Sequence, residues 1–182
     1  MTSRLEVIDR GERLAFSFGD LMRYHGPGSP GGVAHGFKVL ERALPLLAPE
    51  GLCERREIVV ETAFGGPGAR DAFELVTRAV TGDRYRVDAA LARPERGRTL
   101  ERFVFRLAYR ELAVTLELRG GFVSDEFIDL ARTESRSAGQ ERRLDALKLE
   151  MAERVMSRPA SEVYDAGPPG NAPRSGESGL SA

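Results

Sequence analysis

The feature that most constrains this chain is residues 24–38, which hold both of its histidines and five of its 20 glycines. Within it, Ser29 followed by Pro30 is a helix-start signal, because a serine hydroxyl can cap a helix and proline's missing N–H would have no partner in the first turn. After Pro30, apolar residues recur at helical spacing as far as Leu47. The sequence therefore predicts a glycine-rich loop leading into a helix at Pro30, which Pro45 kinks or ends near Leu44.

A loop of this kind has a chemical consequence. The first turn of a helix offers backbone N–H groups without intrahelical acceptors and the positive end of the helix dipole, and both favour an anion. Gly32 and Gly36 lie one turn apart, so another segment can approach the helix closely on that face. We expect a small, anionic ligand here.

A second glycine-rich loop occupies residues 64–68, between a β-rich run at 57–62 and a helix expected at 70–80. Asp71 stands at the start of that helix, where the dipole alone favours a carboxylate. The alternative interpretation is functional: Asp71 faces, across a pocket, the loop that contains His25. Arg70, at the same helix start, could bind an anionic substrate.

The remaining pattern predicts the fold class. Alternating residues indicate a half-exposed strand at 85–89 and an antiparallel hairpin of strands 100–109 and 112–119. Helices are expected at 124–130 and 140–156, and the apolar stripe of the latter indicates either core or an interface between chains. We predict an α+β fold with an antiparallel sheet packed by helices, one domain over residues 1–165, and a disordered tail over 166–182 that is rich in Pro, Gly and Ser.

Composition excludes several classes of function. A net charge of −1 gives no electrostatic case for nucleic acid or an anionic membrane as a partner, and no apolar run approaches the ~20 residues of a membrane span. The first residues lack the apolar core of a signal peptide, which predicts a cytoplasmic location. The single Cys53 cannot form an internal disulfide, and its neighbour Glu54 disfavours a reactive thiolate.

The first glycine loop resembles a signature of the FmdE family, which comprises the E-type chain of formylmethanofuran dehydrogenase and its stand-alone relatives. That signature reads Phe-His-Gly-His-x-Cys-Pro-Gly and is followed by a helix of small residues. The matching positions are Tyr24, His25, Gly26, Pro30 and Gly31, while Pro27 and Ser29 replace the second histidine and the cysteine. In the second helix, Asp71, Ala72 and Thr77 match, while Gly68 and Ala79 stand at cysteine positions. The likeness covers about residues 18–164.

The resemblance implies an FmdE-like fold, paired chains, and an accessory role in one-carbon or molybdenum and tungsten enzyme systems. Of the family's metal ligands His25 alone is matched, so the cofactor stays open, with zinc or another divalent metal as one option. Residues and resemblance together suggest a ligand site, and the candidate ligand-binding residues are Tyr24, Gly26, Gly28, Ser29, Gly31, Gly32, His35, Arg70 and Thr77.

Three classes of function remain. The first is a stand-alone FmdE-like protein that binds a small anionic ligand at the two helix starts and forms a homodimer. The second is a small-molecule enzyme in which His25 and Asp71 perform acid–base or metal-assisted chemistry. The third is a structural oligomerisation module, in which the glycines serve close helix packing.

Overall fold

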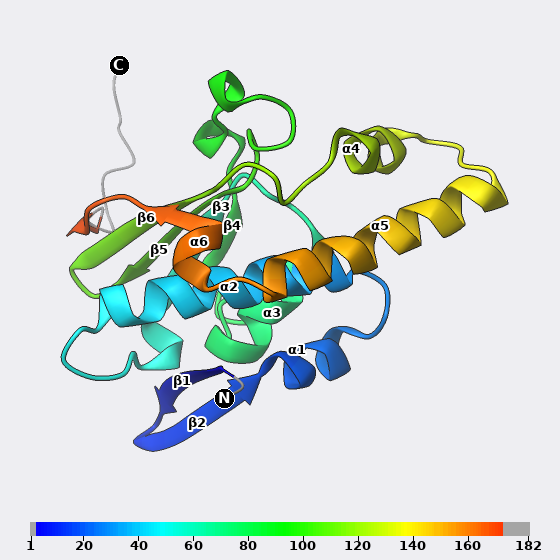
Figure 1. The fold of residues 1–182 in the computed structure, drawn as a ribbon. Coiled ribbons are helices and arrows are strands. Elements are labelled where there is room, and N and C mark those ends of the chain that lie inside the picture. Colours follow the sequence, from blue (N-terminus) through cyan, green and yellow to red (C-terminus); the bar gives the residue numbers. More distant parts are fainter. Residues whose placement is uncertain (1–2, 173–182) are drawn as a thin grey trace.

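Helix α2 (Pro30–Leu47) is the centre of the computed structural model, which describes residues 3–172 (Figure 1). Most of its residues are buried, because helices α3 (Pro67–Thr77) and α5 (Ala138–Met156) pack along it and a sheet covers another side. A helix that is enclosed in this way must carry apolar or small residues nearly all round, and that is what its sequence provides.

The sheet confirms the α+β class. Its strand order is β4-β3-β5-β6-β7, and β8 also pairs with β6. The bounds are β3 (Ile58–Thr62), β4 (Tyr85–Val87), β5 (Val104–Tyr109), β6 (Leu112–Leu118), β7 (Tyr164–Ala166) and β8 (Gly170–Asn171). Every pair is antiparallel except β3 with β4, which run parallel because α3 crosses between them. The sheet is therefore mixed rather than purely antiparallel.

Two further elements precede α2. Strands β1 (Arg4–Asp9) and β2 (Glu12–Ser17) form a separate antiparallel hairpin, and α1 (Phe18–His25) follows directly. The N-cap of α1 is Ser17, whose hydroxyl accepts from the backbone N–H of Asp20 while the Asp20 carboxylate accepts from the backbone N–H of Ser17. This capping box lowers the pKa of Asp20 to about 2, chiefly through the Ser17 hydroxyl.

Two expectations about α2 are wrong. Ser29 occupies the N-cap position, but its side chain makes no capping hydrogen bond. Pro45 does not end the helix near Leu44, because the helix continues to Leu47. Because Pro45 lies in the last turn, it removes only one helical hydrogen bond, and the helix still closes with the Ala48 N–H donating to the Leu44 carbonyl at 3.1 Å.

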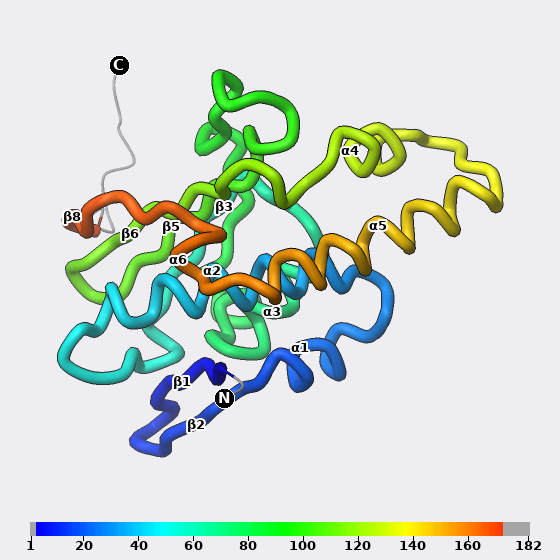
Figure 2. The backbone as a smooth tube through the Cα atoms, viewed as in Figure 1, coloured from blue at the N-terminus to red at the C-terminus, as the bar shows by residue number. Residues whose placement is uncertain are grey.

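The C-terminal part of the chain closes the fold. Helix α4 (Asp125–Arg132) lies beside the N-terminal half of α5. This half of α5 projects beyond the sheet (Figure 2). The apolar stripe of α5, which could have been an interface, is buried inside this chain. Helix α6 (Ala160–Val163) then leads into β7, and short 3₁₀ turns lie at η1 (Arg55–Glu57), η2 (Ala89–Leu91) and η3 (Pro94–Arg96).

The expectation of disorder from residue 166 onward is wrong for residues 166–172. The backbone N–H of Gly167 donates to Thr115, strand β8 pairs with Leu112 and Ala113, and the N–H of Ala172 donates to the Glu111 carbonyl. Backbone pairing along β6 orders these residues although they bury little apolar surface. The rest of the expected tail, residues 173–182, lies outside the described residues.

Candidate functional site

The two glycine-rich loops meet where α2 and α3 begin. A Cβ added to Gly68 would lie 2.5 Å from the Ser29 carbonyl oxygen and 2.7 Å from the Val33 nitrogen. A Cβ on Gly32 would lie 3.2 Å from the Gly68 Cα. The two helix starts therefore touch backbone to backbone, and only glycine fits at Gly68 without displacing one of the helices.

Helix α5 encloses the same end of α2. A Cβ on Gly31 would lie 2.8 Å from the Met151 sulfur and 3.2 Å from the Lys148 carbonyl oxygen. One turn further on, a Cβ on Gly36 would meet the Ala72 Cβ of α3 at 2.6 Å. The small residues of α2 thus serve close packing against two neighbouring helices within this chain.

Beside these helix starts lies a cavity of about 520 Å³. Its walls come from both glycine loops, the end of the sheet, α4 and α5. Aromatic and aliphatic side chains form most of the surface, and the Phe64 and Phe103 rings stack at 4.5 Å. The described lining residues include no acid, and they are Ser29, Gly31, Gly32, Phe64, Gly65, Gly66, Pro67, Gly68, Arg102, Phe103, Phe127, Ile128, Ala131, Arg132, Arg136, Leu144, Lys148 and Met151.

The backbone adds positive potential to this cavity. The first helical hydrogen bonds are those from Val33 to Ser29 at 3.1 Å in α2 and from Arg70 to Gly66 at 3.2 Å in α3. The backbone N–H groups of the helical residues that precede Val33 and Arg70 have no intrahelical acceptor. In α2 these belong to Gly31 and Gly32, and in α3 to Gly68 and Ala69. Two helix dipoles thus present their positive ends to one cavity.

Four basic side chains line the same cavity, and they differ in whether an acidic side chain already pairs with them. Arg132 pairs with Glu101 at 3.0 Å, and Lys148 pairs with Asp145 at 3.0 Å. Arg136 pairs with Glu141 at 2.8 Å and donates to the backbone carbonyl of Leu130 in α4 and to that of Thr133, which follows this helix. Arg102 is exposed and makes no ion pair with any residue in 3–172. It is therefore the cation most available to a ligand.

His25 and Asp71 are also brought together, but outside this lining. The Nδ1 atom of His25 lies 2.8 Å from Oδ2 of Asp71, and the His25 side chain is only 9% exposed. An ionised carboxylate can only accept a hydrogen bond, so Nδ1 carries a proton, and in the neutral form of the ring the lone pair is then on Nε2. That Nε2 is buried and has no hydrogen-bonding partner within residues 3–172. A Cβ added to Gly28 of the loop would lie 3.9 Å from this nitrogen.

His35 lies elsewhere and is not the partly exposed helix histidine that is common at such positions. It is fully buried in α2, and its Nδ1 lies 2.7 Å from the Tyr164 hydroxyl oxygen. Its ring contacts Phe103 at a centroid distance of 4.8 Å. Burial lowers the pKa of His35 to about 3, so the ring is neutral at physiological pH.

The other expected ligand residues divide into two groups. Ser29, Gly31 and Gly32 line the cavity, whereas Tyr24, Gly26, Gly28, Arg70 and Thr77 do not. Tyr24 is 47% exposed, and the Thr77 hydroxyl donates to the Phe73 carbonyl in its own helix. Sequence reasoning missed Arg102, Phe103 and Lys148, because they reach the cavity from segments with no ligand motif of their own.

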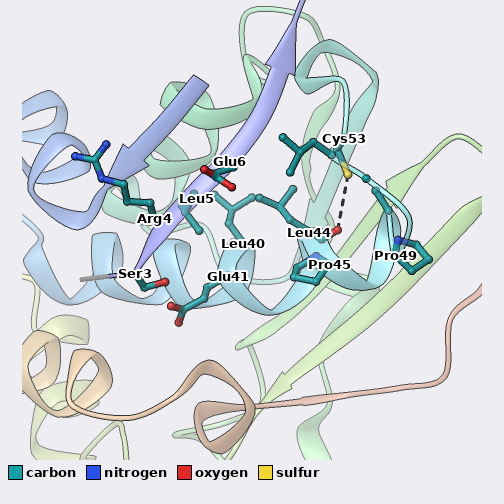
Figure 3. A pocket seen from close by; sticks show the side chains of 13 residues that line it. Ser3, Arg4, Leu5, Glu6, Leu40, Glu41, Leu44, Pro45, Pro49 and Cys53 are labelled. Carbon is teal, nitrogen blue, oxygen red and sulfur yellow. Dashed lines mark hydrogen bonds between the residues drawn. The ribbon is translucent and has the colours of Figure 1, made fainter. Parts of the chain in front are cut away.

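A second hollow, of about 340 Å³, lies between β1 and the C-terminal half of α2 (Figure 3). Glu6, Glu41 and Arg4 give it mixed charge, and Lys38 is already paired with Glu41 at 2.7 Å. Cys53 lines it with its sulfur toward the Leu44 carbonyl. Burial, more than neighbouring charge, raises the pKa of the Cys53 thiol to about 12, which agrees with the expected inert thiol.

Comparison with models of known protein families and with curated proteins finds no match to this chain. Residues 3–172 contain no group of three or more His, Cys, Asp or Glu side chains placed to hold a metal ion. Across the same residues, every helix is too short or too polar to cross a membrane.

Proposed function

We propose that this protein binds a small organic anion in the cavity between the starts of α2 and α3. The observation that carries the proposal is the convergence of two helix N-termini and four basic side chains on a cavity whose described lining has no acid. Oriented N–H groups and helix dipoles stabilise negative charge, and the surrounding apolar walls reduce its screening by water.

The walls also suggest the shape of the ligand. A volume of about 520 Å³ is within the range of ordinary small-molecule sites, and Phe64, Phe103 and Phe127 offer flat apolar surfaces. An anion with an aromatic or aliphatic body would bury that body against the rings while its charged group meets the helix starts. Inorganic anions would leave the apolar part of the cavity unused.

Titration calorimetry with a matched pair of probes tests this proposal. Phenylacetate should bind, and 2-phenylethanol, which has a similar body without the charge, should bind much more weakly. Arg102→Gln should weaken phenylacetate binding about three- to tenfold, because an exposed charged contact is worth about 1 kcal/mol. Arg142→Gln makes the same charge change on exposed α5 surface outside the cavity and should leave the affinity unchanged. Equal binding of both probes, or equal effects of both variants, would contradict the proposal.

The wider role that we propose rests on the resemblance to the FmdE family. It is that of a cytoplasmic, homodimeric accessory protein in one-carbon or molybdenum and tungsten enzyme systems. Light scattering at micromolar concentration tests the dimer, and a monomeric mass would count against it. Recovery of a molybdenum or tungsten enzyme with the tagged protein from its native cells would support the accessory role, and its absence would weaken that role without affecting the cavity.

A second candidate is an enzyme that uses His25 and Asp71. The observation that favours it is the 2.8 Å contact, which holds the imidazole in the tautomer whose Nε2 can accept a proton. Because Nε2 is buried below the loop at Gly28, a substrate would reach it only if that loop moved. Asp71→Asn, which keeps the size of the side chain and permits the opposite tautomer, should abolish such an activity while leaving phenylacetate affinity unchanged.

A further inference from the structure

Helix α4 is a wall of the cavity that is only lightly packed on the rest of the fold. Figure 1 shows it apart from the sheet and beside α5, which is its main packing partner. Ile128 is the one residue of α4 that is buried. Within residues 3–172, no backbone-to-backbone hydrogen bond joins residues 125–132 to another helix or strand. A segment with so few buried contacts and hydrogen bonds opens at a lower cost in free energy than the core does.

Exposed ion pairs help to fix the position of α4. Arg98, in the turn before β5, lies 3.3 Å from Asp125 and also pairs with Asp129. About one turn further along α4, Arg132 donates to Glu101 at 3.0 Å. The Arg98 side chain is 43% exposed, and those of Asp125 and Asp129 are 72% and 65% exposed. Ion pairs this exposed contribute little to stability, because water solvates the separated charges almost as well.

The inner side of α4 favours closure over a ligand. Phe127, Ile128 and Ala131 line the cavity of about 520 Å³, and Phe64 and Phe103 line it from the body of the fold. An apolar ligand body in this cavity would remove the inner surface of α4 from water, which is favourable in proportion to the area covered. Since this gain exists only while α4 is in place, an apolar body shifts the equilibrium of α4 toward the closed position.

We propose that α4 is a lid of the anion site, which opens to admit the ligand and closes on its apolar body. This inference rests on the proposed function. The chain permits such a motion because Phe122 and Val123 are buried in the core just before α4, whereas Glu134 and Ser135 after it are exposed. The helix can therefore turn about Ser124 while the chain after it follows. The ligand class that closes the lid is a carboxylate with an apolar body, because the charged group lies at the starts of α2 and α3.

Amide hydrogen exchange, followed by NMR, tests the lid. Residues 129–132 donate the hydrogen bonds within α4, so their exchange reports its opening. Without ligand they should exchange about tenfold or more faster than the C-terminal half of α5, which packs on α2. Phenylacetate at about ten times its Kd should slow their exchange about tenfold, because opening of α4 forfeits the bound ligand. Acetate at the same concentration carries the charge without the body and should leave their exchange unchanged.

Arg98→Gln separates the lid from the binding residues, since Arg98 does not line the cavity. Loss of its ion pairs should speed exchange at residues 129–132 about two- to fivefold. Arg119→Gln is the matched control, because it removes a comparably exposed ion pair with Asp165 and should leave the exchange of α4 unchanged. Equal exchange of α4 in both variants, or α4 amides that bound phenylacetate does not slow, overturns the lid and leaves the proposed function standing. If phenylacetate does not bind, both proposals fail.

Discussion

Replacing Gly68 by alanine tests the contact that shapes the cavity. The new Cβ would lie 2.5 Å from the Ser29 carbonyl oxygen and 2.7 Å from the Val33 nitrogen, and both are backbone atoms that no rotamer change can move. Ordinary contacts of this kind need about 3.5 Å, so the starts of α2 and α3 must separate by roughly 1 Å. The helix pair is among the most extensively packed in the fold, so the separation disturbs many other contacts.

The size of the effect follows from two opposing terms. Overpacking typically costs about 1–3 kcal/mol, and alanine recovers up to about 1 kcal/mol of helix propensity over glycine. A net loss of about 1–2 kcal/mol should lower the melting temperature of a chain of this size by roughly 2–8 °C. Phenylacetate affinity should fall as well, because the free N–H groups of the two helices no longer converge.

Gly139→Ala is the matched control for this experiment. Gly139 is likewise the second residue of its helix, but an added Cβ there meets nothing closer than 3.8 Å. Its melting temperature, measured by calorimetry, should equal or slightly exceed that of the wild type. If Gly68→Ala melts as high as Gly139→Ala, the close contact between the helix starts is wrong, and the cavity derived from it is wrong with it.

Three further predictions concern stability and reactivity. Truncation after Ala172 should leave the melting temperature unchanged. Truncation after Ala166 should lower it by a few degrees, because β8 and the hydrogen bond from Gly167 to β6 are lost. Equal melting temperatures for the two truncated proteins would show that residues 167–172 do not stabilise the fold. Cys53 should resist iodoacetamide at pH 8 in the folded protein and react in urea, and rapid labelling of the folded chain would contradict its burial. Because the folded pKa of His35 lies near 3 and the unfolded value near 6.5, the unfolded chain binds more protons between these values, so stability should fall as pH drops from about 6.5 to 3. The free energy of unfolding, measured by urea titration at several pH values in that range, should fall less steeply with decreasing pH in His35→Phe than in the wild type. An equally steep fall in both proteins would show that His35 is not the group responsible.

The sequence predicted most of the regular elements, and the reasons are local. Ser29-Pro30 and the apolar period placed α2, and alternation placed β5 and β6 with their turn at Arg110-Glu111. Strand β1 was missed although its buried Leu5 and Val7 alternate with Arg4 and Glu6, the same kind of pattern that placed β5. Strand β8 was missed because pairing with the free edge of β6 orders a sequence whose composition resembles a linker.

The candidate site was harder to predict, because it depends on long-range packing. Glycine content pointed to both helix starts, and a relation between Asp71 and the His25 loop was expected; the structure places the two side chains in direct contact. The burial of His35 required knowing that Tyr164, far along the chain, covers it. Arg102 carries no sequence signal, since its role depends only on where the strand end lies relative to α2.

The measurement that tests the central claim most directly is a map of backbone amide shifts in ¹⁵N-labelled protein titrated with phenylacetate. The largest shifts should fall on Gly31, Gly32, Gly68 and Ala69, whose N–H groups have no helical acceptor. Smaller shifts should appear on the aromatic walls at Phe64 and Phe103. Saturable shifts confined to another part of the surface, or unchanged amides at the starts of α2 and α3, would contradict binding of an anion at this site.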